Sequence, residues 1–198
     1  MKRKIKKILD VMPLVLLVGG LLVAARPIYH LCRWKINEIT ARNSWEKWQH
    51  SYYYRAKLSG SPAVWLRAPG ADLSTLVIHG ASENNLTAYP CLETSCPGLN
   101  EPGIKLILGH RDMHFRKLKN IQVGYSIELE FLDKKIKKYQ VMEIEILTPE
   151  QVVERVKEKK QEDWLVLVTC YPFKYVGPAP KRFTVWSLLN HEGTKDTK

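Results

Sequence analysis

The pattern of apolar and polar positions divides the chain into two parts. A nearly unbroken apolar run extends from Val11 to Ala25. It is preceded by a cluster of five basic residues, Lys2, Arg3, Lys4, Lys6 and Lys7. From Ala63 onward, apolar residues come in short segments, several of which alternate with polar residues. Long apolar runs are typical of membrane-spanning helices, and alternation is typical of strands with one buried face. The pattern therefore predicts an apolar N-terminal helix followed by a domain of strands.

Seven segments of this second part have the composition or alternation of strands: Ala63–Arg67, Thr75–His79, Ile104–Leu108, Ser126–Leu132, Ile136–Leu147, Trp164–Thr169 and Phe183–Leu189. The pair Asp133-Lys134 is suited to a turn between two of them. Thr148-Pro149 has the pattern of an N-cap followed by proline at the first helical position, which predicts a short helix to about Lys157. Many short strands with few helices predict a mainly β fold, a closed or nearly closed β-barrel of about seven to eight strands.

The same pattern predicts the organisation of the whole chain. We expect a basic cytoplasmic N-terminus over residues 1–10, a transmembrane anchor over 11–32, a juxtamembrane aromatic and basic helix with a linker over 33–62, the folded domain over 63–190 and a polar tail over 191–198. The span 11–32 is just long enough for a hydrocarbon core of about 30 Å at about 1.5 Å per residue. The basic cluster before it favours an N-terminus inside the cell. The alternative is a signal peptide cleaved after Val23-Ala24-Ala25. Both place the folded domain outside the cytoplasm.

The chain is strongly basic, with 31 Lys and Arg against 20 Asp and Glu and a net charge of +11. Such an excess can serve nucleic acid, anionic lipid or an acidic substrate. No nucleic-acid-binding motif occurs and no Cys/His set has zinc spacing. We therefore favour a solvated basic surface next to a membrane and expect neither a nucleic-acid partner nor a metal site.

Four cysteines are present: Cys32, Cys91, Cys96 and Cys170. Cys91 and Cys96 lie close together in a loop rich in Pro and Gly, and outside the cytoplasm a local disulfide between them is expected. The alternative is two unrelated free thiols, because sequence does not give the Cα separation. Cys32 lies at the predicted membrane edge.

Two reactive residue types follow apolar strands. Cys170 ends the segment Leu165–Thr169 and precedes Tyr171-Pro172, and His110 follows Ile104–Leu108 after one glycine. A free Cys is more often a small buried hydrophobe, and a His at a strand end is more often structural. A Cys and a His at two strand ends can nevertheless meet as nucleophile and base. Arg182, at the start of the next strand, is available to stabilise a thiolate or an oxyanion.

Two longer motifs decide between these readings. The segment Leu167-Val168-Thr169-Cys170-Tyr171-Pro172-Phe173, with Arg182-Phe183 after it, resembles the active-site strand and loop of sortases. The segment Leu108-Gly109-His110-Arg111-Asp112-Met113-His114-Phe115-Arg116-Lys117-Leu118 resembles the sortase histidine region. The chain is similar to class D-like enzymes and their Gram-negative relatives over about residues 63–189.

This resemblance implies that Cys170 is the nucleophile, His110 the catalytic histidine and Arg182 the catalytic arginine. Asp112 and Thr169 match supporting positions, which orient the histidine loop and shape the pocket. His114 matches no catalytic position. The usual Thr four residues before the nucleophile is Val166 here, and the loop with the cysteine pair also departs from the family pattern.

The resemblance further implies a membrane-anchored cysteine transpeptidase that cleaves a sorting signal of the Leu-Pro-X-Thr-Gly type in a secreted protein and transfers the acyl group to an amine acceptor. It implies no metal and no organic cofactor. The expected partners are the signal-bearing protein, the membrane and an amine from a cell-wall precursor or a protein. The alternatives are another cell-envelope cysteine transpeptidase and a catalytically silent module that only binds sorting signals.

Overall fold

The computed structural model describes residues 2–50, 62–159 and 162–190. Contacts within the chain define two compact units, Met1–Asn37 and Glu38–Lys198. The first helix, α1 (Lys2–His50), belongs to both units. The predicted juxtamembrane segment falls within α1 as far as His50, and its remainder, like the predicted tail over 191–198, lies outside the described residues.

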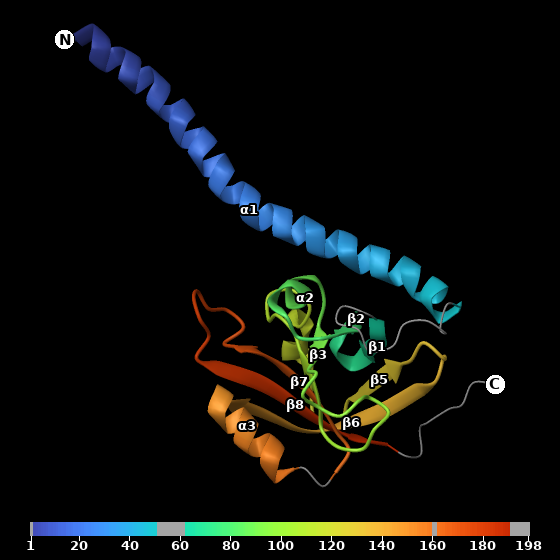
Figure 1. The fold of residues 1–198 in the computed structure, drawn as a ribbon. Coiled ribbons are helices and arrows are strands. Elements are labelled where there is room, and N and C mark those ends of the chain that lie inside the picture. The colour runs from blue at the N-terminus through green and yellow to red at the C-terminus, as the bar shows by residue number, and fades with distance from the viewer. Residues whose placement is uncertain (1, 51–61, 160–161, 191–198) are drawn as a thin grey trace. The chain divides into compact units, whose positions relative to one another are not determined.

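The second unit is a closed barrel of eight strands in the order β1-β2-β3-β4-β7-β8-β6-β5 (Figure 1). The strands are β1 (Pro62–Ala68), β2 (Leu73–His79), β3 (Cys91–Leu92), β4 (Lys105–Leu108), β5 (Ser126–Glu130), β6 (Ile136–Leu147), β7 (Trp164–Tyr171) and β8 (Lys181–Leu189). The helices are α2 (Glu83–Ala88) and α3 (Pro149–Glu158), with short 3₁₀ turns η2 (Pro69–Ala71) and η3 (Arg116–Asn120). The pair β5–β1 closes the barrel, and β4–β7 is one of its parallel pairs.

The predicted mainly β barrel is confirmed, and each of the seven predicted strands is present. The predicted helix begins with a capping box, in which Thr148 accepts from the N–H of Gln151 and the Gln151 side chain accepts from the N–H of Thr148. Sequence reasoning did not identify β3 or α2. Both are too short to show a period, since β3 has two residues and α2 has six.

The interior of the barrel is filled by alternating apolar residues from almost every strand. These include Val64, Leu66, Val77, Ile107, Ile127, Leu129, Tyr139, Val141, Leu165, Leu167 and Val185. Burial of this much apolar surface is the main favourable contribution to the stability of a domain of this size. The core gives the strand ends, where the candidate site lies, a rigid base.

Two further apolar clusters lie on the outside of the barrel. On the side of β1 and β2, Ala41 and Trp45 of α1 pack with Trp65, and the Trp45 indole donates to Glu130 at 3.2 Å. On the side of β7 and β8, Trp164 and Trp186 form a second cluster.

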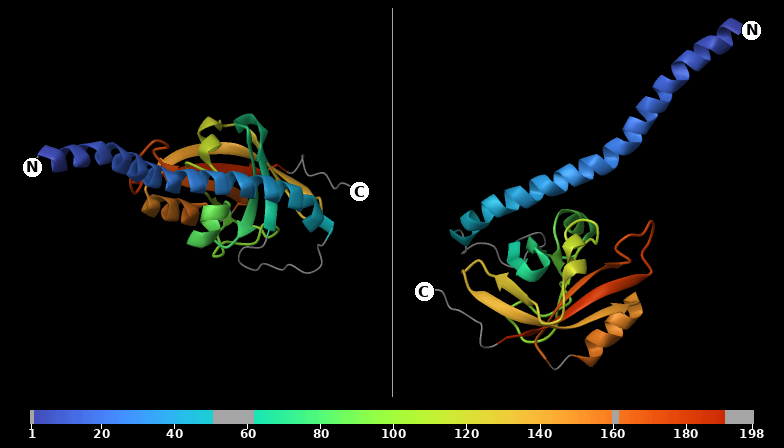
Figure 2. Two further views of the ribbon diagram at one scale, coloured as in Figure 1. Left: turned by 90° about the horizontal axis from the view of Figure 1, so that it is seen from above. Right: turned by 180° about the vertical axis from the view of Figure 1, so that it is seen from behind.

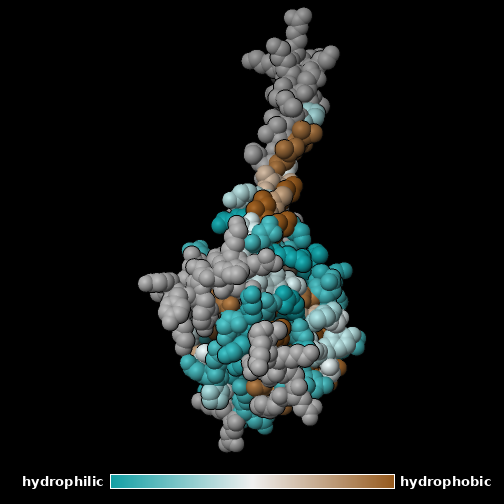
Figure 3. Space-filling model, turned by 90° about the vertical axis from the view of Figure 1, so that its right-hand side faces the viewer, coloured by the Kyte–Doolittle hydropathy of each residue, from teal (hydrophilic) through white to brown (hydrophobic). Residues whose placement is uncertain are grey.

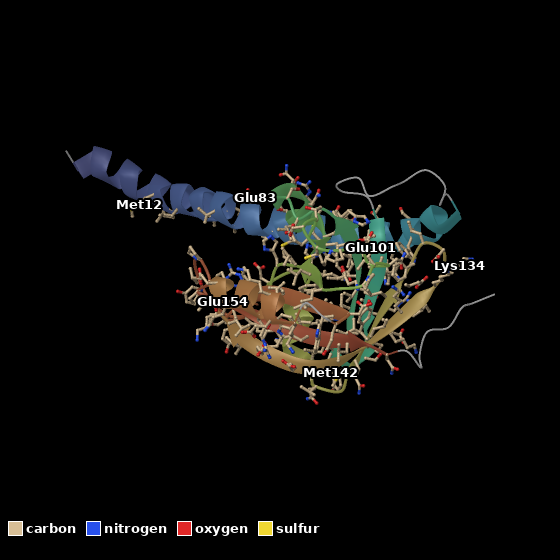
Figure 4. All side chains as sticks on the ribbon, turned by 60° about the horizontal axis from the view of Figure 1, so that its bottom comes forward. Met12, Glu83, Glu101, Lys134, Met142 and Glu154 are labelled. Atoms are coloured by element: carbon tan, nitrogen blue, oxygen red, sulfur yellow. The ribbon has the colours of Figure 1, made fainter. Side chains whose placement is uncertain are left out.

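Helix α3 lies against β6 and β8, as the views in Figure 1 and Figure 2 show. Val156 of α3 packs on the cluster of Trp164 and Trp186, and the Lys159 ammonium lies 4.1 Å from the Trp164 ring centroid. Figure 4 shows the exposed side chains of Glu154 on α3, Glu83 on α2 and Lys134 at the turn between β5 and β6.

One ion pair is unusual for its burial. Lys105, at the start of β4, is 0% exposed and its ammonium group pairs with the Asp163 carboxylate just before β7. A fully buried ammonium is costly unless it has a partner of opposite charge. The pair therefore ties the start of β4 to the start of β7, the two parallel strands that end at the candidate site.

Figure 3 shows hydrophobic side chains along α1 and a mainly hydrophilic face of the barrel unit. Among the described residues, no helix carries an apolar stretch that is long enough to cross a membrane. Many side chains of the predicted span over residues 11–32 lie outside the described set. The transmembrane anchor is thus not shown and stays a prediction.

Candidate active site

Cys170 and Arg182 are direct neighbours across the antiparallel pair β7–β8, in which the register sets Cys170 opposite Arg182. Side chains of directly opposed residues lie on the same face of a sheet. Cys170 and Arg182 are twelve positions apart in sequence, and the β7–β8 hairpin brings them together. Both side chains are partly exposed.

His110 is brought to the same place by the parallel pair β4–β7. Leu108 is in register with Val168, and the N–H of Gly109 donates to the Val168 carbonyl at 3.1 Å. The Thr169 hydroxyl donates to the Gly109 carbonyl at 2.7 Å, so the residue before His110 is bound to the residue before Cys170. His110 itself is exposed.

Gly109 is required by close packing. A Cβ at this position would lie 2.8 Å from the Phe115 ring, which is fully buried. The N–H of Phe115 donates to the His110 carbonyl at 2.9 Å and closes the turn that follows β4. The buried phenyl ring therefore fixes the backbone that carries His110.

Alternation along β7 shows which face of the barrel carries the thiol. Leu165 and Leu167 belong to the interior core, whereas Val166 and Val168 belong to the outer cluster. Successive side chains point to opposite faces of a strand. The Cys170 side chain therefore points to the same outer face of the barrel as Val166 and Val168.

The same alternation places Arg182, which lies within β8. On β8, Phe183 and Val185 point into the barrel, so the Arg182 side chain points to the outer face. On β4, Leu108 packs on the outer cluster, and His110 comes two residues later. Cys170 and Arg182 thus lie on one outer face at the ends of β7 and β8, and His110 follows the end of the neighbouring strand β4.

Arg182 is held by the loop between β7 and β8. Its Nη1 donates to the carbonyls of Ala179 at 3.1 Å and Lys181 at 3.0 Å. Glu150 lies in the first turn of α3, and its pKa is below the ordinary value. The main causes are hydrogen bonds from its own backbone N–H and from the Thr148 hydroxyl, and the nearby Arg182 guanidinium adds to them. Sequence reasoning missed Glu150, since only the pairing of Leu147 with Arg182 brings α3 to the site.

His114 is buried, with 5% of its surface exposed. The pKa of His114 is lowered to about 4, mainly by burial and also by the nearby His110. The backbone carbonyls of Thr87 and Leu86 and the Asp112 carboxylate act in the opposite direction. His114 therefore lies between α2 and the histidine loop and is neutral at pH 7. Asp112 is exposed, two residues after His110.

The predicted disulfide is wrong for this structure, in which Cys91 and Cys96 are both free thiols. Cys91 lies in β3, is fully buried in the cluster with Trp65, and its thiol donates to the Tyr89 carbonyl at 3.3 Å. Burial, with the Glu93 charge, raises its pKa to about 12. Cys96 lies in a separate turn, where its N–H donates to the Glu93 carbonyl at 3.3 Å. The unrecognised strand β3 explains the error, because it sets the direction of the Cys91 side chain.

Sequence reasoning also assigned no role to Arg111, which follows His110. Its Nη2 donates to the Tyr175 carbonyl at 2.8 Å, and its guanidinium lies 5.7 Å from the Tyr175 ring centroid. The signal was within the histidine motif, but the partner lies 64 residues further along the chain. No sequence pattern marks such a contact.

Comparison with known proteins agrees with this geometry. The family model of the sortase domain matches residues 66–190. Sortase D of Bacillus subtilis (strain 168) is 33% identical over 93 residues, which are 44% of this chain and 43% of that protein. The match thus spans less than half the length of this curated relative.

Solved structures extend the similarity over most of the barrel unit. The catalytic domain of SrtD from B. anthracis has a TM-score of 0.59 at 27% identity and covers 72% of this chain and 95% of its own. A Sortase D5 transpeptidase of Clostridium perfringens has a TM-score of 0.61 at 18% identity and covers 80% of this chain and 99% of its own. The latter identity supports a shared fold.

Proposed function

The chain belongs to the sortase family, and we propose on that basis that it is a cysteine transpeptidase of the class D-like type. The observation that carries the proposal is the register of three strands. It sets Cys170 opposite Arg182 and brings His110 to the end of the neighbouring strand β4. A thiol nucleophile, an imidazole and a guanidinium at neighbouring strand ends are the groups that acyl transfer requires.

In the first proposed step, the Cys170 thiolate attacks the carbonyl carbon of the Thr residue in a Leu-Pro-X-Thr-Gly signal. A tetrahedral oxyanion forms, and the Arg182 guanidinium donates hydrogen bonds to it or to the signal backbone. The C–N bond then breaks. His110, as the imidazolium, gives its proton to the leaving amine. The product is a thioester between Cys170 and the N-terminal part of the signal.

In the second step, an amine acceptor attacks the thioester carbonyl. His110, now neutral, takes the proton of that amine, the C–S bond breaks, and the Cys170 thiolate is regenerated. The net reaction exchanges one amide for another. Neither step needs an oxidant, a metal or an organic cofactor.

For the location, the proposal rests on the sequence. The basic cluster from Lys2 to Lys7 and the apolar run from Val11 to Ala25 favour a single-pass anchor with the N-terminus inside and the barrel outside the cytoplasm. The substrate would then be a secreted protein in the cell envelope. Protease added after the outer barrier is permeabilised should digest the barrel. A barrel that is protected until the cytoplasmic membrane is lysed would contradict this location.

The function is tested with the full-length chain, a panel of peptides of the Leu-Pro-X-Thr-Gly type and a set of amines. We expect release of the C-terminal fragment and formation of the amine adduct, both detected by mass spectrometry. A chain that binds a peptide but forms no thioester and no adduct would instead be a silent binding module.

A further inference from the structure

The loop between β7 and β8, residues 172–180, connects the nucleophile to its arginine and projects beyond the two strands (Figure 1). Its first part is anchored, because Phe173 packs with Tyr171 and Phe183 at ring centroid distances of 6.1 and 5.1 Å. Its middle part is exposed, and Val176 is 99% exposed. Apolar packing therefore does not hold the middle of this loop.

Arg111 supplies a contact there. Its Nη2 donates to the carbonyl of Tyr175 at 2.8 Å and lies 3.5 Å from that of Gly177. Its guanidinium also lies over the Tyr175 ring at 5.7 Å. Gly177 has a φ of +98°, a conformation that side chains with a Cβ rarely adopt. The loop is therefore shaped so that two of its carbonyls face Arg111.

A second arginine holds the end of the same loop, since Arg182 donates to the Ala179 carbonyl at 3.1 Å. The two arginines thus bind different parts of the loop. Arg111 does so from the histidine loop, one residue after His110, and Arg182 does so from β8, opposite Cys170. A displacement of the loop at Tyr175 would therefore shift the positions of both His110 and Arg182.

Only one terminal nitrogen of Arg111, Nη2, donates to the carbonyls of Tyr175 and Gly177. The Arg111 Nη1 atom is buried and has no hydrogen-bond partner among the described residues. Buried donors without a partner are rare and need an explanation.

We infer that Arg111 is a positioning residue, which fastens the β7–β8 loop to the histidine loop and so sets His110 and Arg182 relative to Cys170. The inference rests on the proposed function for its catalytic consequence. The guanidinium donates to the loop carbonyls through Nη2 and also lies over the Tyr175 ring, and a Lys lacks the planar, delocalised group that makes both contacts.

The test compares Arg111→Ala and Arg111→Lys with Arg116→Ala, in which an exposed arginine of the same segment is removed. In the full-length chain, hydrogen exchange of the loop amides from Lys174 to Gly177 should become at least tenfold faster in Arg111→Ala. It should be intermediate in Arg111→Lys and unchanged in Arg116→Ala. Unchanged loop exchange in Arg111→Ala would overturn the inference.

Turnover of a signal peptide separates positioning from binding. In Arg111→Ala we expect kcat to fall by about tenfold or more with KM within about twofold, and Arg111→Lys to recover part of kcat. A rise in KM at unchanged kcat would show direct substrate binding and overturn the inference. An unaltered kcat in a folded Arg111→Ala variant would also overturn the inference. Tyr175→Ala, which removes the ring but keeps the carbonyl, should have a smaller effect than Arg111→Ala. If the wild-type chain turns over no peptide, the proposed function fails, and the exchange experiment still decides whether Arg111 holds the loop.

Discussion

Cys170 lies directly opposite Arg182 in the β7–β8 ladder, between the residue pairs Thr169–Phe183 and Tyr171–Lys181. The side chains of two residues in such a position share a face, within reach of one substrate group. The register, more than the length of the connecting loop, therefore determines that a guanidinium accompanies the thiol.

Arg182→Lys tests whether this guanidinium acts through its geometry or only through its charge. A Lys keeps the charge but cannot offer the planar fork of donors. Loss of one oxyanion donor typically costs about 2.7–4 kcal/mol of transition-state stabilisation, so we expect kcat/KM to fall by about 10²- to 10³-fold. The measurement is the release of the C-terminal peptide fragment, with folding checked by circular dichroism. A variant within a few-fold of wild type would show that Arg182 acts only as a charge.

His110 and His114 are four residues apart, and the structure gives them different environments. His110 is exposed at the strand end, and His114 is buried. We expect His110→Ala to remove nearly all turnover, because the leaving amine loses its proton donor. His114→Gln should leave turnover at pH 7 within a few-fold of wild type. A folded but inactive His114→Gln variant would assign the essential histidine to the wrong position.

His114 also predicts a pH dependence of stability. Its pKa in the folded protein, about 4, lies below the ordinary value of 6.5. Between these values the unfolded chain binds more protons, so the free energy of unfolding decreases as the pH falls from about 6.5 toward 4. Because of His114, the free energy of unfolding should be about 2–3 kcal/mol lower at pH 4.5 than at pH 7. His114→Gln should reduce the pH-dependent loss by that amount in urea denaturation, and an equal loss in both proteins would contradict the assignment.

The sequence predicted the parts of the fold that have a period. β6 was predicted to the residue, and the capping box at Thr148 gave the start of α3. The motifs also located Cys170, His110 and Arg182, because each ends or begins a recognisable strand. The roles of these three residues stay predictions until variants are measured.

The remainder depends on contacts that sequence does not encode locally. The two-residue strand β3 is defined by its pairing with β2 and β4, so the direction of Cys91 was missed and a disulfide was expected. Likewise, Arg111 and Tyr175 meet only because β4 and β7 are parallel neighbours. Short elements and contacts between distant loops are set by the closure of the barrel.

The reactivity of the free thiols of Cys91 and Cys96 tests directly whether the two residues form a disulfide. Cys91 is fully buried with a pKa raised to about 12, so in the native, unreduced protein it should react very slowly with iodoacetamide. Cys96 is partly exposed and should react faster, and both should react after denaturation without a reductant. Peptide mapping would contradict the structure if it found a Cys91–Cys96 cross-link.

The buried ion pair predicts a large effect on stability at a distance from the site. Asp163→Ala leaves the ammonium of Lys105 buried without a counter-charge, and breaking such a pair costs about 3–5 kcal/mol. Lys117→Ala removes an exposed pair with Asp72 and should cost at most about 1 kcal/mol. Urea denaturation of the two variants makes the comparison. Equal and small effects would show that Lys105 is accessible to water.

The central claim is that Cys170 forms a thioester with a sorting signal, and intact-mass measurement after incubation with a signal peptide in the absence of an amine tests it most directly. The wild-type chain should gain the mass of the N-terminal peptide fragment, which peptide mapping should locate on Cys170, and the folded Cys170→Ala variant should gain nothing and release no fragment. Acylation or peptide cleavage by the Cys170→Ala variant, or an adduct on Cys32, Cys91 or Cys96 of the wild-type chain, would contradict the assignment of the nucleophile.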